Sequence, residues 1–309
     1  MKKTHTTQIK CSLLLLLASV VWGAAFVAQS LASSSVGTFT FNGLRFIIAG
    51  FCLLPVLKKH GNKANPKEIP HNKLVGGIIC GTALFLASTF QQAGIALGAS
   101  AGEAGFLTAC YIVIVPILGI FLGKKCSVFV WPAVGIALAG LYLLCFSNQD
   151  AARLSMLSAA DIALLLCALL FSVQILCVDR YAPVMSPVAL ACLQFFVSGS
   201  LSLAAAFVIE FLPYPAAWLS SLTSANSWIS ILYTGIFSCA IGYTLQAIGQ
   251  RSLPPALASL LMSLESVFSS IFGWLILNQT MTGKEIIGCV LIFSAVILAQ
   301  IPVKNSQQA

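Results

Sequence analysis

Long apolar runs separated by short polar stretches make up most of the chain. A helix needs about 20 mostly apolar residues to cross a bilayer, so this pattern predicts ten transmembrane helices. The expected segments are Leu13–Leu31, Phe39–Leu57, Leu74–Leu97, Gly105–Leu122, Val128–Phe146, Ile162–Val178, Val188–Phe211, Trp228–Ile248, Leu257–Leu277 and Ile286–Ile301. The apolar–polar alternation of a membrane β-barrel is missing. The predicted fold class is therefore an all-α membrane protein.

The composition supports the same class. Hydrophobic residues make up 59% of the 309 residues and charged residues 8%, against roughly 45–50% and 25% in soluble proteins. This excludes a soluble enzyme, a nucleic-acid binder and a disordered chain, and the lipid bilayer is the expected environment. The 11 cysteines form no C-x-x-C pair and the three histidines lie in polar segments. We therefore expect no metal, no cofactor and no enzymatic centre.

The basic residues indicate how the chain is oriented. With the N-terminus placed in the cytoplasm, thirteen Lys and Arg residues fall in inside segments and two, Arg153 and Lys284, in outside segments. Five of the inside lysines lie between Lys58 and Lys73. By the positive-inside rule this bias predicts a multi-pass protein of the cytoplasmic (inner) membrane with both termini in the cytoplasm.

The two halves of the sequence repeat each other weakly. A shift of 149 residues places Arg45-Phe46 on Gln194-Phe195, and a shift of 154 places Gln92-Ala93 on Gln246-Ala247. Residues 13–146 and 158–301 would then be two repeats of five helices. Because five is odd, the second repeat would lie inverted in the membrane, an arrangement typical of secondary transporters.

Several motifs occur in the same order as in a known family. They are Trp22-Gly23, Gly43-Leu44-Arg45-Phe46, Phe90-Gln91-Gln92-Ala93-Gly94, Ala104-Gly105-Phe106-Leu107-Thr108, Val115-Pro116-Ile117-Leu118-Gly119, Ser263-Leu264-Glu265-Ser266-Val267, Gly273-Trp274-Leu275 and Gly288. With ten helices and an inverted repeat, the chain resembles the EamA-type members of the drug/metabolite transporter superfamily. The resemblance implies a secondary transporter for a small metabolite, with export the expected direction and an amino acid or related compound as one candidate cargo.

The chain departs from this family at helix nine. Ser266 stands where the family usually has proline, which predicts the loss of one kink. In helix four, by contrast, we expect Pro116 to break the helix.

Two charged residues are candidates for transport chemistry. Arg45 lies inside the second apolar run, where an unpaired guanidinium costs about 2.5–3.5 kcal/mol or more. It would bind an anionic group of the substrate, pair with Glu265, or snorkel to the outer headgroups. Glu265 is the deepest acid of the chain, and an apolar site favours its protonated form. It would carry a coupling proton, bind a cationic amine, or serve as a structural carboxyl.

Four further residues are candidates for a substrate cavity. Gln92 and Gln246 occupy matching places in the two halves and would line a cavity or bond neighbouring helices. Tyr111 is the repeat counterpart of Glu265, and Trp22 would form a cavity wall or face lipid. The acids near segment ends, Glu103, Asp161, Asp179 and Glu210, are expected to be solvated at the interface.

The leading hypothesis is alternating-access transport of a small molecule, with a proton as one candidate coupling partner. The alternatives are a channel and a membrane-embedded enzyme. No nucleic-acid partner is expected, and the sequence leaves the oligomeric state open.

Overall fold

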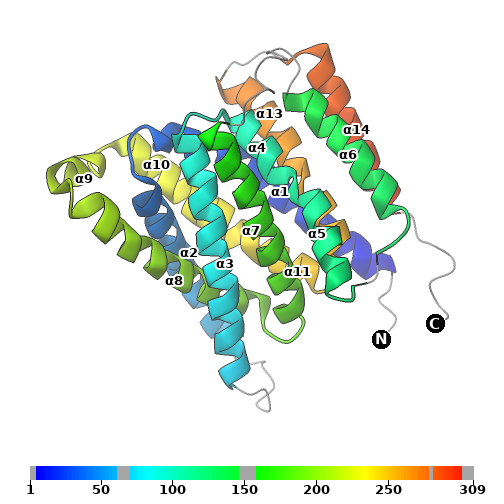
Figure 1. Cartoon of the computed structure of the whole chain (residues 1–309). Helices are drawn as coiled ribbons and strands as arrows, with labels where there is room; N and C mark the ends of the chain where they lie inside the picture. The colour runs from blue at the N-terminus through cyan, green and yellow to red at the C-terminus, as the bar shows by residue number, and fades with distance from the viewer. Residues whose placement is uncertain (1–4, 61–69, 125, 146–157, 278–280, 301–309) are drawn as a thin grey trace.

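The structure is a computed structural model that describes residues 5–60, 70–124, 126–145, 158–277 and 281–300. These ranges form a bundle of helices without strands (Figure 1). The first-half helices are α1 (His5–Ser33), α2 (Thr38–His60), α3 (Pro70–Ala96), α4 (Ala101–Ala109), α5 (Tyr111–Phe121) and α6 (Val130–Cys145). The second-half helices are α7 (Ala159–Tyr181), α8 (Pro187–Ala206), η3 (Phe207–Phe211), α9 (Pro215–Ser221), α10 (Ala225–Tyr233), η4 (Thr234–Tyr243), α11 (Thr244–Gln250), α12 (Pro255–Met262), α13 (Leu264–Leu277) and α14 (Gly283–Ala299).

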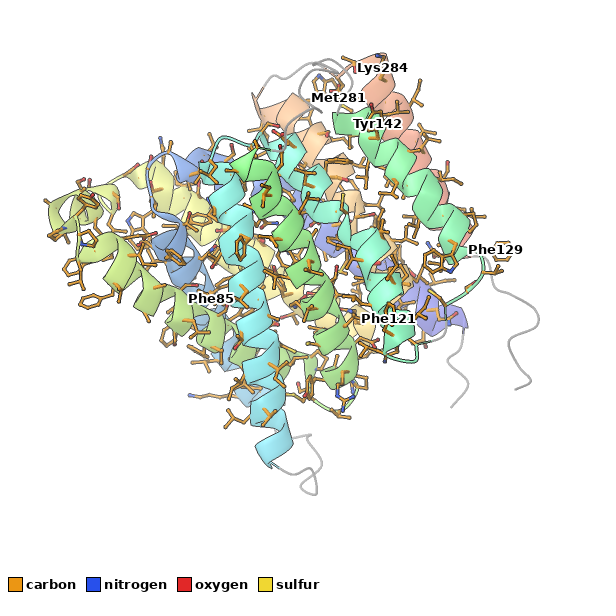
Figure 2. All side chains as sticks on the ribbon, in the orientation of Figure 1. Phe85, Phe121, Phe129, Tyr142, Met281 and Lys284 are labelled. Atoms are coloured by element: carbon orange, nitrogen blue, oxygen red, sulfur yellow. The ribbon has the colours of Figure 1, made fainter. Side chains whose placement is uncertain are left out.

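Within the described ranges, eight helices or helix combinations are long and apolar enough to cross a membrane. They correspond to the expected segments one to four and six to nine. The expected fifth and tenth segments are the shorter helices α6 and α14, so the count of ten crossings stays a prediction. Large apolar side chains lie on the outside, as Figure 2 shows for Phe121, which is 84% exposed. Such a surface suits lipid rather than water.

Helices α6 and α14 pack tightly against each other at one edge of the bundle (Figure 1). Gly140 and Gly288 allow this approach, because a Cβ on Gly140 would lie 2.7 Å from the Gly288 carbonyl oxygen. Small residues at a helix interface are the usual way in which membrane helices pack closely.

The fourth and ninth apolar runs are each divided into two helices. The fourth divides at Cys110, between α4 and α5, and not at Pro116, which lies inside α5. The expectation about Pro116 was therefore wrong. A proline removes one backbone donor, but here that loss is accommodated within α5.

The ninth run divides at Ser263, between α12 and α13. This corrects the expectation that Ser266 removes the kink. The Ser263 hydroxyl donates to the Leu260 carbonyl at 2.9 Å, and the Ser266 hydroxyl donates to the Ser263 carbonyl at 2.7 Å. Serine hydroxyls that bond nearby carbonyls compete with the helical ladder. Two serines thus accompany a break where the family has a proline.

Glu210 differs from the solvated carboxylate that the sequence predicted. From η3 it accepts hydrogen bonds from the backbone nitrogens of Phe39 and Thr40, at 2.8 and 3.0 Å, and from the Thr40 hydroxyl. Gly37 leaves room for this carboxylate, since a Cβ there would lie 2.4 Å from the Glu210 carboxyl carbon. Glu210 therefore caps the first turn of α2 from a helix of the other half, where a negative charge favours the helix dipole.

The other three acids bind nearby groups. Glu103 and Asp161 complete capping boxes with Ser100 and Ser158 at the starts of α4 and α7. Asp179 accepts from Lys124 at 2.6 Å, which joins the ends of α7 and α5. Glu103 and Asp161 are partly exposed at helix starts, whereas the Asp179 side chain is 10% exposed in its ion pair and is not the solvated carboxylate that the sequence predicted.

The cap on α2 predicts the effect of a substitution. Glu210→Ala removes an acceptor from two backbone N–H groups, so we expect a loss of about 1–3 kcal/mol of stability. Thermal unfolding in detergent would measure it as a lower apparent melting temperature. Glu210→Gln keeps one carbonyl acceptor and should fall between the wild type and the alanine variant. Equal melting temperatures for all three proteins would contradict this role.

Candidate functional site

An internal cavity lies between helices of both halves and encloses about 510 Å³, its open mouth included. The lining residues are Trp22, Ala25, Phe26, Gln29, Arg45, Gln91, Thr108, Tyr111, Phe171, Gln174, Ile175, Ser238, Tyr243, Gln246, Met262 and Glu265. Five of the six residues predicted from the sequence therefore meet in one place.

Glu265 and Tyr111 contact each other in this cavity. Glu265 is the second residue of α13 and Tyr111 the first residue of α5, so both lie just after a helix break. The Tyr111 hydroxyl donates to Glu265 Oε1 at 2.9 Å, and the Glu265 side chain is 6% exposed. Two residues that the sequence predicted as counterparts thus contact each other, each at the start of a half-helix.

Arg45 is buried and does not snorkel to the headgroups. It is 3% exposed, its Nη1 donates to Gln29 Oε1 at 3.0 Å, and its guanidinium lies about 5 Å from the ring centres of Phe41 and Phe46. The ring faces favour a cation. Its Nε has no hydrogen-bond partner among the described residues.

Arg45 and Glu265 line the same cavity without forming an ion pair with each other. A buried charge without an opposite charge is costly. Arg45 is therefore suited to bind an anionic group that enters the cavity.

Gln246 and Gln92 have different surroundings although the sequence predicted them as a pair. Gln246 lines the cavity, and its Nε2 donates to Gln174 Oε1 at 3.1 Å. Gln92 does not line it; its Nε2 donates to the Gln29 carbonyl at 3.4 Å. Gln92 therefore only bonds a neighbouring helix, whereas Gln246 both bonds a neighbouring helix and lines the cavity.

Trp22 forms part of the cavity wall. Its indole nitrogen donates to the Ser238 carbonyl at 3.0 Å, and its ring centre lies 5.0 Å from that of Tyr243. Ser238 and Tyr243 belong to η4, a stretch of π-helix in which carbonyls can be freed for other partners. Gly242 lies under the indole and leaves room for it.

No metal site accompanies the cavity: among the described residues, no three His, Cys, Asp or Glu side chains are grouped to hold an ion. The arrangement offers instead a buried cation, a buried carboxyl, several amides and aromatic walls. Such a lining can bind and orient a small polar molecule.

Comparisons with known proteins identify the family of the chain. The model of the EamA-like transporter family matches residues 9–146 and 158–300. The chain belongs to this family.

Two relatives extend the comparison. This EamA-like transporter is 30% identical over 294 residues to an uncharacterized transporter of Archaeoglobus fulgidus, covering 94% of the chain and 85% of the relative. It is 28% identical over 291 residues to a chloroplastic WAT1-related protein of Arabidopsis thaliana, covering 92% of the chain and 68% of the relative. A solved crystal structure with 20% identity superposes with a TM-score of 0.74 over 95% of this chain and 98% of the other, which shows a shared fold.

Sequence reasoning missed several polar residues of the EamA-like transporter's cavity. They are Gln29, Gln91, Thr108, Gln174, Ser238 and Tyr243. Gln29 and Gln174 did carry a signal, since each is an amide inside a long apolar run. Ser238 carried none, because its backbone carbonyl makes the contact with Trp22.

The packing of Trp22 against Gly242 gives a testable prediction. In Gly242→Ala the new Cβ would lie 2.5 Å from Trp22 Nε1, so the indole must move and lose its bond to the Ser238 carbonyl. We expect a loss of about 1–3 kcal/mol, read as a lower melting temperature. Gly105→Ala is the matched control, since its Cβ would meet no atom closer than 3.6 Å. An unchanged Gly242→Ala protein would contradict the tight contact.

Proposed function

We propose that this EamA-like transporter is a secondary transporter that carries a small metabolite across the cytoplasmic membrane by alternating access, in the direction of export. The observation that carries the proposal is the central cavity, where Arg45, Glu265 and Gln246 from different helices face one buried space. A substrate site near the middle of the membrane and between two repeats is what alternating access requires. The direction of export rests on the family resemblance alone.

Contacts between corresponding elements support an inverted repeat of residues 13–146 and 158–301. Helix α2 packs on its counterpart α8, and α6 packs on its counterpart α14. The rings of Phe46 and Phe195, which correspond in the repeat, stack with centres 5.9 Å apart. Tyr111 and Glu265, which also correspond, form a hydrogen bond. Elements that contact their own counterparts lie along a two-fold axis, and this is the geometry that the repeat predicts.

The helix contacts between the two halves also define two equivalent arrangements of the bundle. α3 packs on α7, and the corresponding pair in the other half is η4–α11 packed on α1. If the two halves exchange these arrangements, the cavity opens toward the opposite side. Transport then needs no covalent step, only binding energy that differs between the two states.

We propose both termini and the Lys58–Lys73 loop on the cytoplasmic side. In support, Lys124 and Asp179, both expected on that side, form an ion pair. Most of the loop, Asn62 included, lies outside the described residues.

Orientation can be measured directly. In a variant whose native cysteines are replaced, Asn62→Cys should resist an impermeant maleimide added to intact cells and react after the cells are opened. A cysteine at Leu97, on the opposite end of α3, should show the reverse. Labelling of position 62 from outside intact cells would contradict the proposed topology.

Glu265 is proposed to couple transport to a proton or to a substrate amine. Its support is burial inside the cavity, where Tyr111 is the hydrogen-bond donor found among the described residues. A carboxyl in such a place changes its interactions when it gains or loses a proton. The alternative assignment is a structural carboxyl.

Glu265→Gln separates these two assignments. The amide keeps the size and one acceptor for Tyr111, so insertion and melting temperature should stay near the wild type. Proteoliposomes loaded with a cellular metabolite extract, with a pH gradient imposed, should lose gradient-driven efflux, measured by mass spectrometry of the released compounds. Tyr111→Phe, which keeps the carboxyl, is the matched control and should retain part of the flux.

Wild-type efflux with unchanged pH dependence in Glu265→Gln would make Glu265 structural. Efflux that fails to saturate with internal concentration in the wild type would favour a channel over a transporter.

A further inference from the structure

A small apolar cluster lies at the end of the bundle where α1 ends and α2 begins. The members of this first end cluster come from α1, the α1–α2 turn, α2 and α10, and they are buried: Ala32, Val36, Phe41 and Ile231. The cluster is separate from the main core. Phe41 does not line the central cavity, but its ring centre lies 5.1 Å from the guanidinium carbon of Arg45, which does. The packing of this end and the charge of the cavity are therefore in direct contact.

Polar contacts hold the first turn of α2 on its other side. Trp218 of α9 donates from Nε1 to the Thr40 hydroxyl at 2.7 Å, and that hydroxyl donates to Glu210 of η3. The start of α2 is thus fastened to η3 and α9, whereas its contact with α1 and α10 through Phe41 is apolar (Figure 1). Apolar attraction is not directional. The first end cluster can therefore part without breaking a hydrogen bond between its members.

A second end cluster occupies the corresponding place in the other half. It lies where α7 ends and α8 begins, and its members are Cys80, Val178, Ala182, Met185, Leu190 and Ala247. The shift of 149 residues places Val36 on Met185 and Phe41 on Leu190. Val36 and Met185 also hold the same place in their turns, two residues before the helix that follows. The proposed inverted repeat therefore places one such cluster at each end of the bundle.

The two end clusters differ in their link to the cavity. In the first, the Phe41 ring stands against the charge of Arg45; in the second, Leu190 and Gln194 occupy the corresponding positions. A leucine offers no ring face and a glutamine no charge, so the cation–π attraction joins only the first of these pairs. An anion that binds Arg45 competes for the same guanidinium. Occupation of the cavity can therefore act through Arg45 on the first end cluster and not on the second.

We propose that Phe41 is a positioning residue that couples occupation of the Arg45 site to opening of the first end cluster. With the cavity empty, the guanidinium attracts the Phe41 ring and this end stays closed. An anionic group bound by Arg45 weakens the attraction and shifts the population toward an open end. Under the proposed topology this is the outer end, so cargo that enters from the cytoplasm opens its own exit. This coupling deepens the proposed transport function and rests on it.

Cysteine labelling at the matched turn positions tests the coupling. In a protein whose native cysteines are replaced, Val36→Cys reports on the first end cluster and Met185→Cys on the second; the native side chains are 4% and 3% exposed. The rate of reaction with a charged maleimide is measured on the purified protein, with and without a thiol-free cellular metabolite extract. The extract should raise the rate at position 36 about tenfold, the effect of losing one desolvated cation–π contact. It should not raise the rate at position 185.

A double-mutant cycle separates coupling from packing. Without extract, Phe41→Leu should raise labelling at position 36 about tenfold, because leucine fills the cluster but offers no ring to the guanidinium. Arg45→Gln should raise it to a similar extent and should abolish the response to the extract. The double variant should show no further increase, because both changes remove the same contact. Two effects that multiply would overturn the coupling and leave Phe41 a packing residue.

Two ring variants are matched controls. The ring centre of Phe46 lies 5.0 Å from the same guanidinium carbon, but Phe46 belongs to the main core, so Phe46→Leu should leave the rate at position 36 unchanged. Phe41→Tyr keeps the ring face and should keep the wild-type rate. A variant that only loosens the fold would label faster at positions 36 and 185 alike and melt at a lower temperature.

The metabolite-efflux measurement keeps the two proposals apart. Saturable efflux together with a rate at position 36 that ignores the extract would sink the coupling alone, whereas the absence of efflux would sink the transport function. If the cysteine-free protein does not fold, hydrogen exchange of residues 34–41 in the protein with its native cysteines gives the same comparison, because opening exposes these backbone amides. Exchange that is equal in the wild type, Phe41→Leu and Arg45→Gln would likewise overturn the coupling.

Discussion

The hydrocarbon of a bilayer offers no hydrogen-bond partner to a polar side chain, and this constraint decides where the polar residues of the chain lie. Charged residues make up only 8% of the sequence. Arg45 and Glu265, which lie deep in apolar runs, both turn into one interior cavity, where Gln29 and Tyr111 provide neutral partners. Each partner satisfies a hydrogen bond without neutralising a charge. The cavity therefore remains attractive to a polar ligand.

Near-symmetry and its exceptions together explain the site. Under the proposed repeat, counterpart residues contact each other, Phe46 on Phe195 and Tyr111 on Glu265. The two halves differ where Arg45 of the first corresponds to Gln194 of the second. The cavity therefore receives a positive charge from the first half and none from the corresponding place in the second. Under the proposed inverted repeat, the symmetric frame would allow two equivalent arrangements, while the exceptions would determine what is bound.

The sequence was sufficient for the features that depend on composition and spacing. Apolar runs of helical length predicted an all-α membrane protein, and the isolated polar residues within them predicted five cavity residues. It was insufficient for features that depend on the local path of the backbone. The break in helix nine comes at Ser263, where the Ser263 and Ser266 hydroxyls bond nearby carbonyls, and not at a proline. Likewise, Gln92 and Gln246 match in sequence, yet only the surroundings of each helix decide which of them reaches the cavity.

Glu210 shows the same limit at the end of a helix. Its sequence position near a segment end was clear, but its partners on α2 are about 170 residues away along the chain. Contacts of that kind depend on how the two halves dock, which no local pattern encodes.

The central claim is that one cavity is exposed alternately at the two ends of the bundle. Pairs of spin labels across each end, one at the Ser100 and Ser158 end and the other at the Lys124 and Asp179 end, would measure it by electron–electron double resonance. We expect two populations of label-to-label distances at each end. A pH change should lengthen the distance at one end while it shortens the distance at the other. A single unchanging distance at both ends, or both ends long at once as in an open channel, would contradict alternating access.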